Sequence, residues 1–105
     1  MAESKSFVVE CFWTGVSEDD LPPLDERAQR SVAVLAREGE QVRYLGSLLM
    51  REDEVVLCFF EGSAASVRRA AERAAIPFER ILQTAGSGGP VPPATNETAA
   101  CRRDL

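Results

Sequence analysis

The stretch from Val42 to Glu61, VRYLGSLLMREDEVVLCFFE, decides the fold of this chain. Its two halves are rich in β-branched and other large apolar residues, and the polar run Arg51–Glu54 separates them. Two strands joined by such a short connection form an antiparallel hairpin, so we expect strands over 42–50 and 55–61. The second begins VVLCFF, which is apolar at every position and therefore typical of a strand at the centre of a sheet.

The segments on either side of the hairpin complete the fold pattern. Upstream, FVVECFW at 7–13 predicts a strand, and apolar residues spaced three and four apart over 21–35 predict an amphipathic helix. Downstream, we expect Ser63 to cap a second helix that Pro77 ends, with a short last strand over 78–84. The order β-α-β-β-α-β predicts a ferredoxin-like α+β domain, a four-stranded antiparallel sheet with both helices on one face.

Two helices cover only one face of such a sheet, yet the first and third strands are apolar on both faces. A single chain would then expose a sizeable apolar patch to water. We therefore predict a homodimer whose sheets face each other, as in a dimeric α+β barrel, with a cavity between them. The alternative is a curled sheet whose second face is covered by the C-terminal tail.

The chain has 105 residues, which fits one domain, and its composition changes at residue 85. Glycine and proline dominate 85–98, where almost no large apolar side chain occurs. Such a segment buries too little surface to offset its ordering entropy. We therefore expect a ferredoxin-like domain over 1–84 and a flexible tail over 85–105.

The composition excludes several classes of function. The chain has no histidine, so one chain cannot hold a Ser-His-Asp or Cys-His catalytic group or an imidazole-ligated metal. Its net charge of −5 repels phosphate backbones, and we expect no nucleic-acid partner. No apolar run approaches the ~20 residues of a membrane span. The first residues do not resemble a signal peptide, so we expect no membrane contact and a cytoplasmic location.

Cysteines and carboxylates fall on the first and third strands, which are neighbours in a ferredoxin-like sheet. Cys11 and Cys58 could meet there as a dithiol or a soft-metal site. Both could equally be small core residues, because free cysteine is among the most buried residue types. Glu10 and Glu61 could point into the dimer cavity as acid–base groups, or lie at strand ends in water.

The remaining candidates would line the predicted cavity. Arg43 and Tyr44 point to opposite faces of their strand, so one of them gives the cavity a charged anchor or a phenol. Trp13 could line the cavity mouth, or pack at the dimer rim. The predicted ligand-binding set is Trp13, Arg43, Tyr44, Ser47, Cys58 and Glu61.

Three segments, VRYLGS at 42–47, LCFFEG at 57–62 and AAIPFERI at 74–81, carry a family resemblance. In this order and at these separations they resemble a family of small bacterial proteins often described as nickel-binding or nickel-responsive. The resemblance runs from about Phe7 to Thr84. It implies a dimeric ferredoxin-like domain, in agreement with the pattern of strands and helices.

The resemblance also implies where the family's ligands would fall. Two positions that usually carry histidine in the family are Gly46 and Ala70 here, whereas the third-strand cysteine and glutamate are kept as Cys58 and Glu61. Nickel sites favour nitrogen ligands, and a thiolate with a carboxylate makes a poor one. We therefore expect no cofactor, with nickel implied by the resemblance alone. The remaining metal candidates are Cys11, Cys58 and Glu61.

The sequence leaves three functional hypotheses. The first is a homodimeric module that binds a small ligand. The second is a cofactor-free oxygenase, isomerase or cyclase acting on a small organic substrate, an analogy that rests on fold alone. Its catalytic candidates are Glu61, Glu10, Arg43 and Tyr44. The third is an accessory or assembly subunit that grips its partner with the tail.

Overall fold

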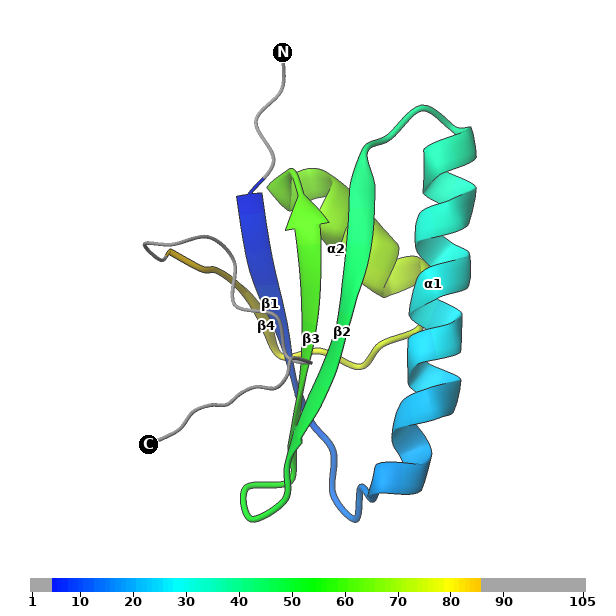
Figure 1. Ribbon diagram of the computed structural model, residues 1–105. Coiled ribbons are helices and arrows are strands. Elements are labelled where there is room, and N and C mark those ends of the chain that lie inside the picture. Colours follow the sequence, from blue (N-terminus) through cyan, green and yellow to red (C-terminus); the bar gives the residue numbers. More distant parts are fainter. Residues whose placement is uncertain (1–4, 86–105) are drawn as a thin grey trace, which may run out of the picture.

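The computed structural model describes residues 5–85 of the chain. Residues 1–4 and 86–105, which include nearly all of the predicted tail, lie outside the described part. The elements follow the predicted β-α-β-β-α-β order, with one 3-10 turn, η1, before the first helix (Figure 1). Their bounds are β1 (Lys5–Phe12), η1 (Glu18–Asp20), α1 (Leu21–Arg37), β2 (Val42–Met50), β3 (Val55–Gly62), α2 (Ala64–Arg73) and β4 (Arg80–Gln83).

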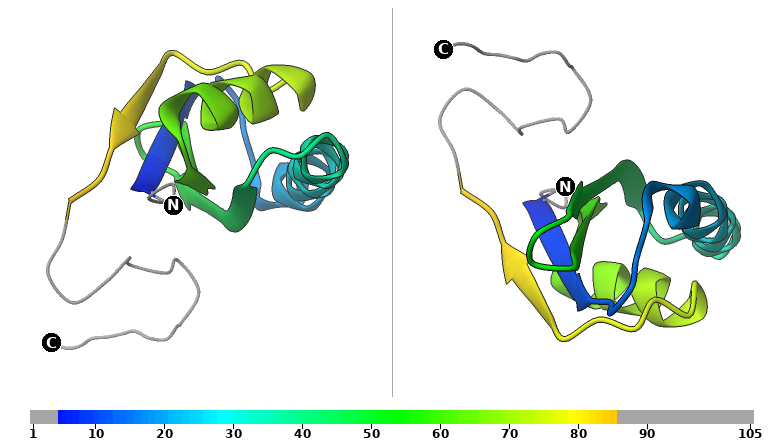
Figure 2. Two further views of the ribbon diagram at one scale, coloured as in Figure 1. Left: turned by 90° about the horizontal axis from the view of Figure 1, so that it is seen from above. Right: turned by 90° about the horizontal axis from the view of Figure 1, so that it is seen from below.

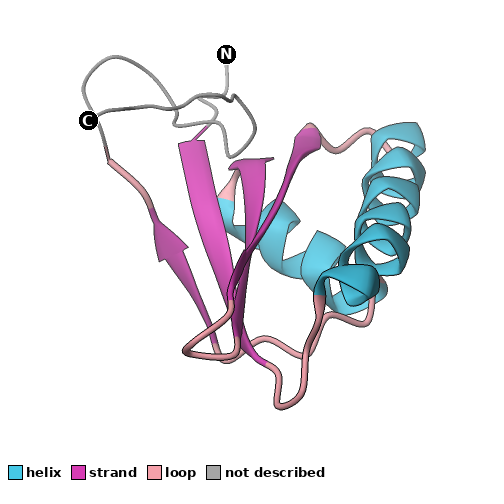
Figure 3. Cartoon of the chain, turned by 60° about the horizontal axis from the view of Figure 1, so that its bottom comes forward, coloured by secondary structure: helices cyan, strands magenta, loops and turns pink. Residues whose placement is uncertain are grey.

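The four strands form one antiparallel sheet in the order β2-β3-β1-β4. Because β3 pairs with both β1 and β2, the strand that was predicted to be central lies inside the sheet. Both helices lie on the same side of the sheet, with α1 beside β2 and α2 across β1 and β3 (Figures 2 and 3). The ferredoxin-like α+β prediction is confirmed. No helix within residues 5–85 is long and apolar enough to cross a bilayer.

A β-bulge interrupts the pairing of β2 with β3. Tyr44 lies opposite Phe60 and Gly46 lies opposite Phe59, so Leu45 is an extra residue in β2. Gly46 has a φ of 129°, which a glycine adopts more readily than other residues. The bulge shifts the alternation by one residue, and Tyr44 and Ser47 therefore both point toward the helices.

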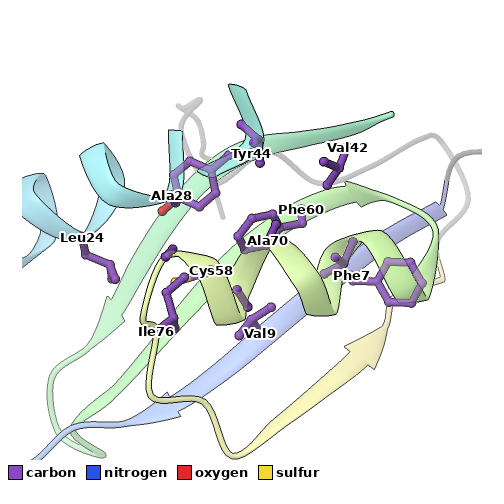
Figure 4. Close-up of a cluster of buried hydrophobic side chains, with 14 of the residues drawn as sticks. Phe7, Val9, Leu24, Ala28, Val42, Tyr44, Cys58, Phe60, Ala70 and Ile76 are labelled. Atoms are coloured by element: carbon purple, nitrogen blue, oxygen red, sulfur yellow. The ribbon is translucent and has the colours of Figure 1, made fainter. Parts of the chain in front are cut away.

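The core lies between the sheet and the helices. Leu24, Ala28 and Leu35 of α1 have no exposed surface, and neither do Val67 and Ala70 of α2. The small side chains of α2, Ala70 among them, pack directly against the sheet (Figure 4). Packing of apolar stripes against one sheet face thus fixes where both helices lie.

The ends of α2 show why the helix stops where it does. The Ser63 hydroxyl accepts a hydrogen bond from the Ser66 amide, which confirms the predicted N-cap. At the other end Ala75 has a φ of 59°, and Ile76 N–H donates to the Ala71 carbonyl in a Schellman-type turn. The Nε of Arg27 in α1 donates to the Ala74 carbonyl at 2.9 Å, so one helix caps the other.

Element ends differ from the prediction in the first and last strands, and the third strand is longer by Gly62. The last strand covers 80–83 rather than 78–84, since Phe78 turns back to Ile76 through a backbone hydrogen bond. The first strand covers 5–12 rather than 7–13. The Trp13 amide still donates to the Glu54 carbonyl opposite it, but the Glu54 amide turns back to the Arg51 carbonyl, so the pairing ends there.

Candidate functional site

The sheet divides the predicted site residues between its two faces. We call the face under α1 and α2 the inner face and the opposite one the open face. Alternation and register assign Cys11, Tyr44, Ser47 and Cys58 to the inner face. The open face carries Ser6, Val8, Glu10, Phe12, Arg43, Gly46, Leu48, Met50, Val55, Leu57, Phe59, Glu61, Arg80 and Leu82.

On the inner face, a carboxylate of α1 meets two hydroxyl groups of β2. Asp25 Oδ1 accepts a short hydrogen bond from the Tyr44 hydroxyl and a second one, at 2.7 Å, from Ser47 Oγ. Both hydroxyls reach it because the bulge places Tyr44 and Ser47 on one side of the strand. The arrangement satisfies a partly buried carboxylate with two donors.

Asp25 was missed in the sequence. A signal for it was present, since Asp25 lies four residues after Leu21 and three before Ala28 and thus borders the apolar stripe of α1. A carboxylate at the edge of a buried stripe needs a polar partner on the facing element. The sequence did not show that partner, because the bulge that creates it depends on strand pairing.

Tyr44 links this carboxylate to the centre of the core. Its side chain packs against Phe60 with ring centroids 5.0 Å apart (Figure 4). Burial, the neighbouring Cys58 and the hydrogen bond to Asp25 raise the pKa of Tyr44 far above its usual value. The phenol therefore stays protonated and acts as a hydrogen-bond donor.

The two cysteines meet on the inner face, as the strand order predicted. Cys11 lies opposite Val56 and Cys58 lies opposite Val9, so the cysteines are diagonal neighbours on adjacent strands. Their exposed fractions are 1% and 0%, and both side chains point to the same side of the sheet. The contact with Cys11, together with burial, raises the pKa of Cys58. Donation from the Cys58 thiol lowers the pKa of Cys11.

These contacts form a continuous polar track, which we call the inner cluster. The Cys58 thiol has Cys11 on one side and the Tyr44 hydroxyl on the other, and Ser47 lies directly across the strand pair from it. Asp25 ends the track at the half-buried boundary between α1 and β2. The inner cluster consists of Asp25, Tyr44, Ser47, Cys58 and Cys11.

The open face holds the other candidates in two ion pairs. Arg43 Nη1 lies 2.9 Å from Glu61 Oε1, and Arg80 Nε lies 2.5 Å from Glu10 Oε1. The side chains of the two glutamates are only 22% and 17% exposed, because they lie low on the sheet under their arginines. Each carboxylate therefore already has a cationic partner within the chain.

Apolar side chains surround these ion pairs. Phe12, Leu48, Met50 and Leu82 are 55%, 40%, 42% and 39% exposed. They come from β1, β2 and β4, and the register places them on the same face as Phe59. The apolar open face that the sequence predicted is therefore present in the single chain.

Trp13 lies apart from both sets of residues. It follows the end of β1 and packs, partly buried, against the core cluster. The predicted ligand-binding set thus does not come together at one point. Tyr44, Ser47 and Cys58 are on the inner face, whereas Arg43 and Glu61 are on the open face.

The residues present do not fit a nickel site built by one chain. Within residues 5–85, no group of three or more histidine, cysteine, aspartate or glutamate side chains could hold a metal ion. Cys58 and Glu61 point to opposite faces of β3 and cannot bind the same metal ion. Ala70 is fully buried against the sheet, and Gly46 offers no donor. Nickel's preference for nitrogen ligands is therefore unmet in the described part of the chain.

An antiparallel sheet with both helices on one face and an apolar second face defines a ferredoxin-like α+β domain. Comparison with known proteins places the domain more closely. The profile of the family described as "Nickel responsive protein SCO4226-like" matches residues 7–83. The chain belongs to this family, as its three sequence segments suggested.

A crystal structure of SCO4226 from Streptomyces coelicolor A3(2) is similar to this chain. The two share 25% sequence identity with a TM-score of 0.57, over 78% of this chain and 98% of SCO4226. The likeness therefore extends over nearly the whole of SCO4226. No curated protein sequence matches the chain.

Proposed function

We propose that the protein is a homodimer that joins its open faces and binds a small organic ligand between them. The observation that carries the proposal is the open face itself, with four large apolar side chains each about two-fifths exposed or more. Single exposed apolar residues are ordinary, whereas a contiguous group over three strands is typical of an interaction surface.

The charges of the open face favour a second copy of the chain as the partner. The chain as a whole carries −5, so two copies repel each other in general. On the open face two arginines balance two glutamates, and this surface is neutral. A two-fold related copy would present the same apolar groups and balanced ion pairs, which makes the contact self-complementary.

Gly46 supports a ligand space within this contact. It lies opposite Phe59, and β2 presents no side chain there. The adjoining positions carry Leu48 and the Arg43–Glu61 ion pair. In a face-to-face dimer this notch would receive an apolar molecule that stacks on Phe59, with a polar group directed to Arg43.

Association is tested by sedimentation velocity at micromolar concentration. The full chain is expected to sediment as a dimer, and Phe12→Glu with Met50→Glu to sediment as a monomer because they place charge in the contact. Ala33→Glu, on the exposed side of α1, is the matched control and leaves the dimer intact. A monomeric full chain that dimerises after removal of residues 86–105 would instead show that the tail covers the open face.

Ligand binding is tested by native mass spectrometry and metal analysis of protein purified without a polyhistidine tag. The expected result is a retained organic molecule that is lost on Phe59→Leu, which removes the ring it stacks on and keeps an apolar side chain in the contact. Stoichiometric nickel in the untagged protein would contradict the proposal and would indicate that the protein binds a metal ion instead.

A further inference from the structure

The buried pair of thiols in the inner cluster takes no part in the proposed dimer, because it lies on the other face of the sheet. Cys11 and Cys58 are both free, and each is essentially without exposed surface. Two buried thiols that are diagonal neighbours on adjacent strands, with a tyrosine on the same face of the next strand, are a distinctive group for the core of so small a domain.

The strand geometry disfavours a disulfide between them. Diagonal neighbours on adjacent antiparallel strands have Cα atoms about 7–8 Å apart. Disulfides join cysteines whose Cα atoms are usually roughly 4.4–6.8 Å apart, so this pair could close only if the strands moved. A metal ion that bridges two sulfurs spans a longer distance than the ~2.05 Å sulfur–sulfur bond and suits this spacing better.

From this geometry we infer that Cys11 and Cys58 form a two-coordinate site for a soft monovalent cation, Cu(I) in particular. Thiolate ligands bind soft ions such as Cu(I) in preference to Ni(II), which favours nitrogen and oxygen ligands. The pair provides two sulfur donors at a core position closed to solvent, so water is not at hand as a further ligand. The site is independent of the dimer and of the organic ligand.

The rest of the inner cluster supports such a site from outside the ligands. On binding, the ion takes a lone pair from each sulfur, and each thiol that becomes a thiolate releases its proton to solvent without any electron transfer. The bound group then carries one negative charge. The Tyr44 hydroxyl donates to Asp25 in the metal-free chain, and on binding it would turn its single proton from Asp25 to the Cys58 sulfur, while Ser47 remains on Asp25. Such outer hydrogen bonds orient and tune metal ligands.

The inner cluster also provides a route to the surface. Asp25 is half-buried at the α1–β2 boundary, and the polar track from it leads to Cys58 through Tyr44 and Ser47. Loading requires only that α1 separate from β2 locally, which leaves β1 and β3 paired. Slow uptake is expected, since the thiols are fully covered in the closed state.

The test is anaerobic titration of the reduced full chain with Cu(I) supplied as its bicinchoninate complex. One equivalent of Cu(I) per chain is expected to leave the chelator. Cys11→Ala and Cys58→Ala should each weaken the capture at least tenfold. Cys101→Ser is the matched control, since it removes the third thiol but leaves the pair intact, and it should bind like the parent chain. The proposed site would be wrong if either alanine variant bound Cu(I) as tightly as the parent chain, or if Cys101→Ser abolished Cu(I) binding.

A second measurement keeps the inference testable if an alanine variant fails to fold. X-ray absorption of the Cu(I)-loaded parent chain should give two sulfur neighbours and no oxygen or nitrogen neighbour. Excess Ni(II) should leave this signature unchanged. A higher coordination number, displacement by Ni(II) or no capture by the parent chain would each refute the assignment.

Discussion

Phe59 and Phe60 are consecutive residues of β3 that meet opposite conditions. Phe60 points to the inner face, where it has no exposed surface and packs on Tyr44. Phe59 points to the open face and stays half-buried beside Val8 and Leu57, which are half-buried too. The inner face is completed by the chain's own helices, whereas the open face has no cover from residues 5–85. One strand therefore stabilises the fold on one side and, in the proposed dimer, forms the contact on the other.

The largest effect on stability is expected when a large side chain is removed from the inner face. Phe60→Ala should lower the free energy of unfolding by about 3–5 kcal/mol, because it leaves a cavity in a closely packed core. Phe59→Ala should cost much less in dilute solution, with a cost that rises with protein concentration as the dimer forms. Urea unfolding at two protein concentrations measures both. Equal, concentration-independent losses would show that the two faces do not differ in this way.

A smaller loss of stability is expected when a hydrogen bond of the inner cluster is removed. Tyr44→Phe removes the hydroxyl that donates to Asp25 and leaves the ring against Phe60. The free energy of unfolding should fall by about 1.5–3 kcal/mol, the range for hydrogen bonds to charged groups. Ser47→Ala, which removes the other donor to the same carboxylate, should act in the same direction. An unchanged unfolding midpoint in both variants would mean that the inner cluster contributes no stability.

The helix that covers the inner face offers a change of opposite sign. Ala75 adopts a left-handed conformation after α2, with a φ of 59°. Ala75→Gly should raise the free energy of unfolding by about 1 kcal/mol, since glycine has no Cβ to strain there. Ala33→Gly, at an exposed position inside α1, should lower it by about 0.5–1 kcal/mol. Thermal unfolding distinguishes the two, and a loss of stability in both would contradict the assignment of the left-handed turn.

The smallest effect is expected on the open face of the dissociated chain. Phe12 is 55% exposed, so Phe12→Ser should change the free energy of unfolding by no more than about 0.5 kcal/mol when the protein is dilute. The same variant should raise the dimer dissociation constant at least tenfold. A large loss of stability in dilute protein, without any effect on association, would assign Phe12 to the fold instead.

The fold was predictable because its signals are local. The polar run Arg51–Glu54 between two apolar segments fixed the hairpin, and the spacing of apolar residues fixed both helices. Strand order then followed from the β-α-β-β-α-β succession, which predicted that Cys11 and Cys58 lie on neighbouring strands. The opposite orientations predicted for Arg43 and Tyr44 were also correct.

The site was less predictable because it depends on pairing rather than on sequence spacing. The bulge at Leu45 arises from the register of β2 on β3, and it alone brings Ser47 to the same carboxylate as Tyr44. Simple alternation separates Cys58 from Glu61, three positions later, and this separation shows that the two could not form one site. The roles proposed for the tail concern residues 86–105, outside the described part, and stay predictions together with the enzymatic alternative.

The sheet order has a consequence for the time at which this domain can fold. The first strand of the chain lies beside the last, with Val8 opposite Leu82. During synthesis the β2–β3 hairpin can form early, because its contacts are close in sequence, whereas β1 lacks its outer neighbour until residue 83 has left the ribosome. We therefore expect the nascent chain to resist proteolysis only once β4 is complete. Translation arrest at successive lengths beyond that residue would locate the transition.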